Sequence, residues 1–554
     1  MKTLRHGGYG RPVTTTVTTI LVALSCFLVA GLGLGDNKKP SEEPIPLTVP
    51  KADCGPGDHP ETALQGQVPA SLRASGFHGF NCNLQLIGQS RGDGANWQAA
   101  QFLEGKKAGK DNGNGNDNGN RNDNGNGRIC AYHGTASPTA SPPSRNPATL
   151  GVPVVDLTEP SSPIAMGYLQ TTSMLDPWES LKVNERRQLL AADDGWNGSH
   201  GPKIDVYDLS EDCRFPQLLA SVSLGTGTDG GPIAPAPIFG HEGAWAPDGL
   251  TYYIGSTTAD RYYHAIDMTD PTRPKYITSF LGLRAHGLSI SDDGNRAYVA
   301  HSGPGYTLAE LLDPNVPGNN GFAILDTSEV QARLPNAQIR LISKFFYKDG
   351  RASQHTIPVK IKGKPYVIQV DEGGGGGLTF AGWQNSCAAN ISPFPNPRIV
   401  DISDETNPKL VSKIMLETHN PANCASVLPD LVGLSIFTYG SHYCSVDNRD
   451  KATTLACGFF NSGIRVFDIR DPARPKEIAY YNPAGTTTPS PGSNHVTTGQ
   501  WRAGGPDWCS AQVHLDADRG TLWTTCQDNG LLSLKFTHGV WPFPQSKTPP
   551  GKQN

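Results

Sequence analysis

The sequence predicts an all-β fold, a seven-bladed β-propeller with an N-terminal signal segment and disordered insertions. Two observations support this prediction. The 554 residues include 63 Gly and 46 Pro, a composition that favours many short strands and turns over long helices. A short strand ending in aspartate also recurs at intervals of roughly 50 to 75 residues, which are too long for solenoid units and suit four-stranded blades with insertions.

The recurring element is a strand, a turn and a second strand. In GIRVFDIRDPARPKEIAYY at 463–481, alternating β-formers lead to an aspartate, prolines provide the turn, and an apolar run begins the second strand. Six copies end their first strand at Asp156, Asp208, Asp267, Asp326, Asp401 and Asp468. GLLSLKF at 530–536 is a degenerate seventh copy, so seven blades are expected.

The seventh copy lacks the strand after its turn, and an N-terminal segment supplies a replacement. NCNLQLIGQS at 81–90 resembles the second strand of another copy, NPKLVSKI at 407–414. We therefore expect 81–90 to pair into the last blade, which closes the ring and removes exposed sheet edges. The propeller should span 80–540.

Two further segments are expected to lie outside the blades. The Asn-, Gly- and Asp-rich stretch at 107–128 cannot bury a core, which predicts a disordered insertion in the first blade. Residues 541–554 should form a C-terminal tail.

The N-terminus predicts export. Arg5 and Arg11 precede an apolar run at 16–35, followed by a polar, proline-containing segment. The run fits a cleaved signal peptide at 1–35, and its length also fits an anchor that holds the protein to the membrane by 16–35. The protein should be secreted or extracytoplasmic, with 36–79 as an exposed stalk.

The cysteines predict disulfides. Apart from Cys26 in the signal segment, ten of the 11 cysteines remain, and an even count in an exported chain favours disulfide bonds. Cys444 with Cys457, and Cys509 with Cys526, each bracket a predicted hairpin and should be bonded. The spacing lacks CxxC pairs, so a structural zinc site is the weaker interpretation.

Several repeat copies resemble a known family. GVPVVDLTEP, GFAILDTSE, PRIVDISDETNPKLV and GIRVFDIRDPARPKEIAYY are similar to the LVIVD repeat, a propeller repeat of exported bacterial proteins. The resemblance covers most of 80–536 and implies a propeller in the cell envelope or outside the cell. It implies no particular reaction.

Composition narrows the classes of partner and chemistry. The net charge is −5 and there is no Lys/Arg block, so a nucleic-acid partner is not expected. The chain has no P-loop lysine motif, GxSxG elbow or HExxH. We expect a monomer that meets an extracellular or cell-surface ligand, polymer or protein, and that contacts a membrane only through an uncleaved N-terminal segment.

A second repeating pattern carries the candidate site. Each blade should begin with a short strand that runs into a turn, and several of these strands start at a titratable residue. If they are the innermost strands, their starts gather around the central channel at one face. The candidate ligand-binding residues are Glu179, His241, Glu242, His286, His355, His442 and His514.

Three interpretations of these histidines remain open. They could be ligands, with His241, His286, His355 and His514 binding copper, iron or zinc in a metal-dependent oxidoreductase. They could form the working face of a binding or scaffold module, with no cofactor certain. The structural alternative is that each imidazole bonds the backbone of the neighbouring blade and ties the ring together.

Two further groups of residues are weaker candidates for a functional site. DEGGGGG at 371–377 places Asp371 and Glu372 on a loop free to approach a ligand, although a flexible surface insertion is the commoner meaning. Trp178, Trp245 and Trp383 are candidates to line a face, although buried aromatic residues are commoner in propellers.

Overall fold

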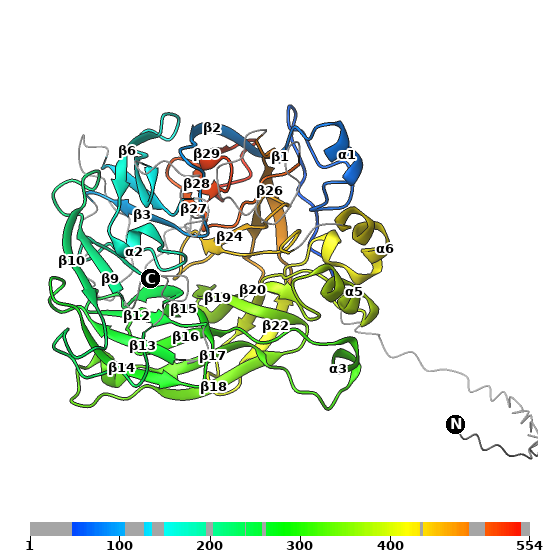
Figure 1. The fold of residues 1–554 in the computed structure, drawn as a ribbon. Coiled ribbons are helices and arrows are strands. Elements are labelled where there is room, and N and C mark those ends of the chain that lie inside the picture. Colours follow the sequence, from blue (N-terminus) through cyan, green and yellow to red (C-terminus); the bar gives the residue numbers. More distant parts are fainter. Residues whose placement is uncertain are drawn as a thin grey trace, which may run out of the picture. The chain divides into compact units, whose positions relative to one another are not determined.

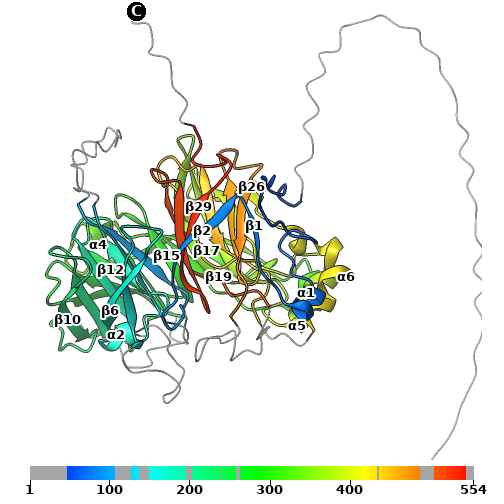
Figure 2. The same ribbon diagram turned by 90° about the horizontal axis from the view of Figure 1, so that it is seen from above.

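The described part of the chain forms seven antiparallel β-sheets arranged in a ring (Figures 1 and 2). In this computed structural model, the described residues are 47–105, 127–135, 149–194, 203–238, 240–257, 262–432, 436–486 and 505–544. The predicted seven-bladed propeller is confirmed. The predicted signal segment, almost all of the insertion at 107–128, and the tail from residue 545 lie outside the described residues.

The blades follow one another along the chain. Blade one contains β3 (Ala99–Leu103), β4 (Ile129–His133), β5 (Val152–Asp156) and β6 (Ile164–Leu169). Blade two contains β7 (Lys182–Asn184), β8 (Leu189–Asp193), β9 (Lys203–Asp208) and β10 (Gln217–Ser223). Blade three contains β11 (Glu242–Trp245), β12 (Thr251–Gly255), β13 (Tyr262–Asp267) and β14 (Lys275–Leu281). Blade four contains β15 (Ala285–Ile290), β16 (Arg296–His301), β17 (Asn320–Asp326) and β18 (Arg340–Tyr347).

The remaining blades include strands from the N-terminal segment. Blade five contains β19 (Gly350–Ile361), β20 (Lys364–Gly374), β21 (Arg398–Asp401) and β22 (Lys409–Lys413). Blade six contains β23 (Cys444–Val446), β24 (Thr454–Gly458), β25 (Ile464–Asp468), β26 (Lys476–Asn482) and β1 (Phe80–Cys82). Blade seven contains β27 (His514–Asp516), β28 (Thr521–Cys526), β29 (Gly530–Phe536) and β2 (Leu84–Ser90).

Short helices lie in the connections between these strands. They are α1 (Ala70–Ser75), α2 (Thr172–Leu175), α3 (Leu308–Leu312), α4 (Ser328–Gln331), α5 (Phe380–Ala388) and α6 (Cys424–Val427), with 3-10 turns η2 (Glu417–His419), η3 (Pro421–Asn423) and η4 (Leu428–Leu431). Helices α1, α5 and α6 gather at one side of the ring in both views (Figures 1 and 2).

The first strand of each blade lies at the inner edge of its sheet. Strand β3 contacts β7, β7 contacts β11, β11 contacts β15, β15 contacts β19, and β23 contacts β27. The apolar core lies between neighbouring blades. For example, Tyr253 and Tyr263 of blade three pack with Leu288 and Val299 of blade four. The beginnings of the inner strands are therefore held in a fixed register around the axis.

The repeated aspartate has a structural role in the turn before each outer strand. Its carboxylate accepts a hydrogen bond from the backbone N–H two residues later, a local turn that Asp forms readily. The N···O distance is 2.9 or 3.0 Å in all six copies, at Asp156, Asp208, Asp267, Asp326, Asp401 and Asp468. The recurring sequence element is therefore the third strand, the turn and the fourth strand of a blade.

Substitution of Asp267 tests this role. Asp267 accepts from both the backbone N–H and the hydroxyl of Thr269, at 2.9 and 2.6 Å. Asp267→Ala is expected to lower the free energy of unfolding by about 1 kcal/mol because the turn loses its acceptor. Asp267→Asn keeps an acceptor oxygen and should cost less. Urea unfolding of the two variants checks this, and equal stabilities would contradict it.

The N-terminal segment closes the ring as expected. Strand β2 pairs antiparallel with β29, with Leu84 opposite Phe536 and Ser90 opposite Leu531. Strand β1 adds a fifth strand to blade six through β26. In both views these blue strands lie beside the orange and red strands of the C-terminal blades (Figures 1 and 2). Closure therefore involves two blades, where the sequence indicated one.

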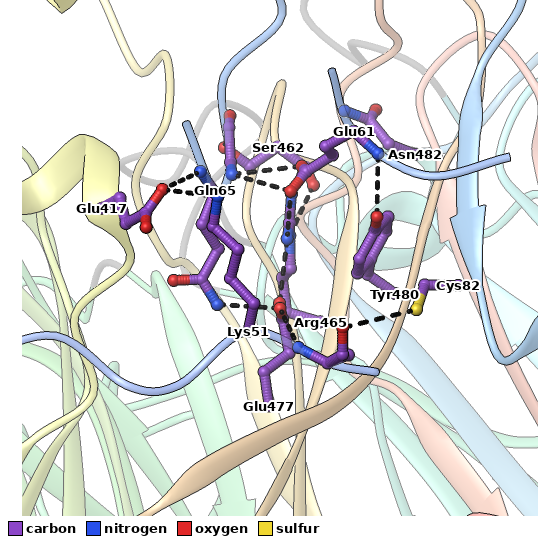
Figure 3. Close-up of polar contacts among 12 residues, drawn as sticks. Lys51, Glu61, Gln65, Cys82, Glu417, Ser462, Arg465, Glu477, Tyr480 and Asn482 are labelled. Carbon is purple, nitrogen blue, oxygen red and sulfur yellow. Dashed lines mark hydrogen bonds and ion pairs between the residues drawn. The ribbon is translucent and has the colours of Figure 1, made fainter. Parts of the chain in front are cut away.

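Residues 47–79 differ from the expected exposed stalk, because they pack against blades five and six. The backbone N–H of Val49 donates to the carbonyl of Met415 at 2.9 Å, and Val68 is fully buried. Figure 3 shows the polar contacts, in which Arg465 of β25 lies between Glu61 of this segment and Glu477 of β26. The sequence did not reveal this packing, because the contact between Glu61 and Arg465 joins residues that are 404 positions apart.

Five disulfides link the described cysteines: Cys54–Cys82, Cys130–Cys213, Cys387–Cys424, Cys444–Cys457 and Cys509–Cys526. The two predicted pairs are confirmed. Each pair joins two directly opposed residues of an antiparallel pairing, with Cα atoms 4.0 and 4.1 Å apart. Disulfides in this number are typical of an extracytoplasmic protein. Among the described residues no helix has both the length and the apolar character needed to cross a membrane.

Candidate functional site

Four residues of the second sequence pattern, Glu179, His241, His286 and His442, lie close together. Glu179 and His241 precede the inner strands β7 and β11, and the two segments are linked by a backbone hydrogen bond from the Glu179 N–H to the His241 carbonyl at 3.3 Å. His286 lies in β15, and His442 precedes β23. All four side chains are buried.

The Glu179 carboxylate is the centre of this group. Its Oε2 atom lies 3.2 Å from Nε2 of His241 and 3.6 Å from Nε2 of His286. Its Oε1 atom lies 3.4 Å from Nε2 of His442. Three imidazoles from three different blades therefore direct the same ring nitrogen at one carboxylate.

Glu372 provides a second carboxylate. It lies near the end of β20, and its Oε1 and Oε2 atoms lie 3.0 Å from Nε2 of His442 and 3.8 Å from Nε2 of His286. The ligand atoms form two overlapping groups of three that share Glu179: one with His241 and His286, the other with Glu372 and His442. We call these five residues the axial centre.

The other ring nitrogens of two histidines fix their orientation. Nδ1 of His286 lies 3.1 Å from the carbonyl of Ser353, and Nδ1 of His442 lies 2.8 Å from the carbonyl of Ser510. Because a carbonyl oxygen only accepts, each Nδ1 carries the proton and donates it. In the neutral rings, the Nε2 lone pairs then face the carboxylates.

This arrangement calls for positive charge, because buried lone pairs and carboxylate oxygens repel one another unless a cation lies between them. Burial disfavours protonation of His442, but its bonds to Glu179 and Glu372 outweigh burial and raise its pKa to about 9. Burial lowers the pKa of His286. Burial favours neutral Glu179, but the three imidazoles outweigh it and hold its pKa well below the usual range.

The separations in the axial centre fit a metal ion. Nitrogen and oxygen ligands about 2.0–2.2 Å from a tetrahedral ion lie about 3.4 Å from one another. The five separations between Nε2 atoms and carboxylate oxygens in the axial centre run from 3.0 to 3.8 Å. Metal-bound histidines also commonly donate their other N–H to a backbone carbonyl, as His286 and His442 do.

A comparison with protein-family models identifies one repeat. The model of the LVIVD repeat family matches residues 398–415, which hold β21, the Asp401 turn and β22. The chain carries an LVIVD repeat. A search of curated proteins returned no match.

Three solved structures are reported as similar to this chain. A protein from Lactobacillus plantarum is 11% identical, with 69% of this chain and 87% of that chain covered and a TM-score of 0.39. A putative 6-phosphogluconolactonase from Bacteroides uniformis is 12% identical, with 74% and 95% covered and a TM-score of 0.42. Kuenenia stuttgartiensis hydrazine synthase is 12% identical, with 74% and 92% covered and a TM-score of 0.42.

The predicted site residues His355 and His514 lie in the same register but have different partners. Nε2 of His355 bonds the backbone of Cys444 in the next blade, at 3.2 Å from its oxygen. Nε2 of His514 lies 3.1 Å from the carbonyl of Ala99, and its ring stacks on Trp523. His355 and His514 therefore bond the backbone of the neighbouring blade, as the structural interpretation expected. The Nδ1 atoms of His286 and His442 do the same.

Glu242 lies beside the axial centre and outside its groups of ligand atoms. Its carboxylate oxygens bond Nζ of Lys182 at 2.9 Å and the hydroxyl of Tyr443 at 2.8 Å. Burial raises the pKa of Glu242 to about 7. Of the four predicted metal ligands, the structure brings together His241 and His286 and adds His442 with the two glutamates.

From the sequence, Glu372 belongs to a glycine-rich segment that is more typical of a flexible surface insertion. Its strand β20 is instead part of the long β19–β20 hairpin, and Asp371 forms a buried ion pair with Arg398. The glycines after Glu372 allow close packing, since a Cβ atom at Gly374 would lie 2.5 Å from the Pro393 carbonyl. The feature of the sequence that pointed to Glu372 as a site residue was its position directly before the glycine run.

Two other clusters of ligand-type residues in the described chain do not form metal sites. One contains Cys54 and Cys82, and the other contains Cys213. These cysteines are in disulfides and offer no thiolate. Of the candidate tryptophans, Trp245 and Trp383 are buried in the core, whereas half-buried Trp178 lies 6.2 Å from the His241 ring.

Proposed function

We propose that this LVIVD propeller is an exported binding protein that holds a divalent transition-metal ion in its axial centre. The ligands are His241, His286 and His442 with Glu179 and Glu372. One observation carries the proposal: the Nε2 atoms of His286 and His442, oriented by backbone carbonyls at Nδ1, are directed at carboxylate oxygens 3.0–3.8 Å away.

A metal ion accounts for this arrangement better than protons alone. A proton on His442 satisfies the contacts of that ring, but burial lowers the pKa of His286 and so disfavours a proton on the Nε2 atom that faces Oε2 of both glutamates. A divalent ion also balances the two negative charges of Glu179 and Glu372. Mixed imidazole and carboxylate ligands suit zinc, copper and iron.

The position of the centre supports a role in binding an external ligand. The three ligand histidines lie just before or near the start of the inner strands of their blades, and the five disulfides are typical of a protein that works outside the cytoplasm. A metal in the axial centre can take a donor atom from a cell-surface or extracellular ligand that reaches it. The propeller then acts as a rigid frame that brings ligands from several blades together.

A metal-dependent oxidoreductase is the second candidate function. The observation that favours it is the imidazole-rich ligand set, which is compatible with redox-active copper and iron as well as with zinc. The identity of the bound metal separates the two candidates. Copper or iron in the native protein favours oxidoreductase chemistry, and zinc favours binding.

Metal analysis of the untagged, exported protein tests the proposal. We expect about one transition-metal ion per chain after purification without chelator or after reconstitution. His442→Ala should lose this metal, while His514→Ala should keep it, because Nε2 of His514 is already bonded to the Ala99 carbonyl. Elemental analysis by mass spectrometry measures both. A protein that takes up no zinc, copper or iron, or equal retention by the two variants, would contradict the proposal.

A further inference from the structure

An aromatic cluster lies directly beside the axial centre. It consists of Trp97, Trp178, Phe437, Phe460 and Trp508, which we call the aromatic wall. Trp97 and Phe460 lie 5.1 and 5.2 Å from the His442 ring, measured between ring centroids. The wall therefore contacts two of the proposed metal ligands, since Trp178 lies near His241.

The wall is assembled from four blades. Trp97 precedes β3, Trp178 precedes β7, Phe437 precedes β23, Phe460 follows β24, and Trp508 precedes β27. Trp97 lies at its middle, with ring centroids 5.6–6.2 Å from those of the other four. The wall is a separate cluster from the cores between blades, and Trp178 and Phe437 are only partly buried.

The backbone of the wall is held in an unfavourable conformation. Trp178, Phe437 and Phe460 have φ angles of 43°, 48° and 40°. Among the described residues, these are the Phe, Tyr and Trp residues with positive φ. Such conformations are costly for bulky side chains and concentrate at functional sites, where the surrounding structure maintains them.

The wall also offers one hydrogen-bond donor. The indole N–H of buried Trp97 has no acceptor among the described residues. The indole N–H of Trp508, in contrast, donates to Oδ1 of Asn461 at 3.0 Å. An unpartnered buried donor is unfavourable in a free protein and is satisfied when a ligand supplies an acceptor.

We infer that the aromatic wall binds a small aromatic molecule that carries an oxygen atom, of the phenol class, next to the axial metal. The ring of the ligand packs against the wall, and its oxygen accepts from Trp97 Nε1. A sugar would need several polar partners, whereas the five residues of the wall provide one unpartnered hydrogen-bond donor, the Trp97 indole N–H. This inference rests on the proposed metal centre for its function, but the wall can bind without the metal.

Phenol titration tests the inference. Binding is followed by ligand-observed NMR with metal-loaded wild type, Phe437→Ala and Phe346→Ala. Phe346 is the matched control, a half-buried phenylalanine stacked on His301, 5.0 Å between ring centroids, away from the wall. We expect Phe437→Ala to weaken phenol binding about fivefold and Phe346→Ala to leave it unchanged.

A second variant isolates the hydrogen bond. Trp97→Phe keeps an aromatic ring and removes the N–H, so it should weaken phenol binding more than toluene binding. Glucose should not compete with phenol. No phenol binding by wild type, equal affinity of wild type and Phe437→Ala, or competition by glucose would overturn the inference.

The metal content of the same samples separates this inference from the proposed function. A metal-loaded protein that does not bind phenol contradicts the aromatic ligand and leaves the metal centre standing. A protein without metal that binds phenol through Phe437 supports the aromatic ligand and contradicts the metal centre.

Discussion

Replacing Glu179 with glutamine is expected to weaken metal binding by more than about 100-fold, the upper end of the effect of losing a residue that only supports a ligand. Glu179 belongs to both groups of ligand atoms, with Oε2 directed at His241 and His286 and Oε1 directed at His442. Glutamine has the same shape but lacks the charge, and its amide nitrogen must take the place of one oxygen. Competition with a chromophoric chelator measures the dissociation constants.

Glu242→Gln is the matched control for this experiment. Glu242 is buried and forms a parallel backbone bridge with Glu179, so the two residues lie side by side. Its carboxylate bonds Lys182 and Tyr443, and a glutamine can keep both contacts. Its metal affinity should stay within about tenfold of wild type. If Glu179→Gln binds metal as tightly as Glu242→Gln, Glu179 is not a ligand.

Replacing Arg465 with leucine is expected to lower the free energy of unfolding by about 3–5 kcal/mol, because it leaves two buried carboxylates without their positively charged partner. The guanidinium is fully buried between Glu61 and Glu477, lies 2.8 Å from Glu477 Oε1, and stacks over the Tyr480 ring (Figure 3). The loss should also release residues 47–79 from blade six. Urea unfolding measures the first effect and limited proteolysis the second.

Arg470→Leu provides the comparison for Arg465. Arg470 follows the same β25 strand, and its side chain is 47% exposed and paired with Asp468 at 2.7 Å. An exposed pair contributes about 0–1 kcal/mol, so this variant should be close to wild type. If the two arginine variants have similar stabilities and similar protease resistance, the buried cluster does not hold the N-terminal segment in place.

The blades could be predicted from the sequence because their signal is local. The aspartate and the turn after it lie within a few residues, and the same hydrogen bond to the residue two positions later recurs in each copy. Closure by β2 could also be predicted, since its sequence resembles an outer strand. The packing of residues 47–79 could not, because the partner of Glu61 lies in β25.

The register of the candidate site could be predicted, but the direction of each imidazole could not. His355 lies within the inner strand β19 and His442 just before the inner strand β23, yet His355 uses Nε2 for the neighbouring backbone and His442 uses Nδ1. That difference depends on the side-chain rotamer and on the carbonyl offered by the next blade. Glu372 reaches the centre through the length of the β19–β20 hairpin, which a glycine-rich sequence does not reveal.

Anomalous X-ray diffraction from crystals of the metal-loaded protein tests the metal centre most directly. Data collected above and below the absorption edge of the metal found by elemental analysis locate the ion. The proposed function predicts a peak among Nε2 of His241, His286 and His442 and the carboxylates of Glu179 and Glu372. A peak elsewhere on the protein, or no peak at the axis of a fully loaded sample, would contradict it.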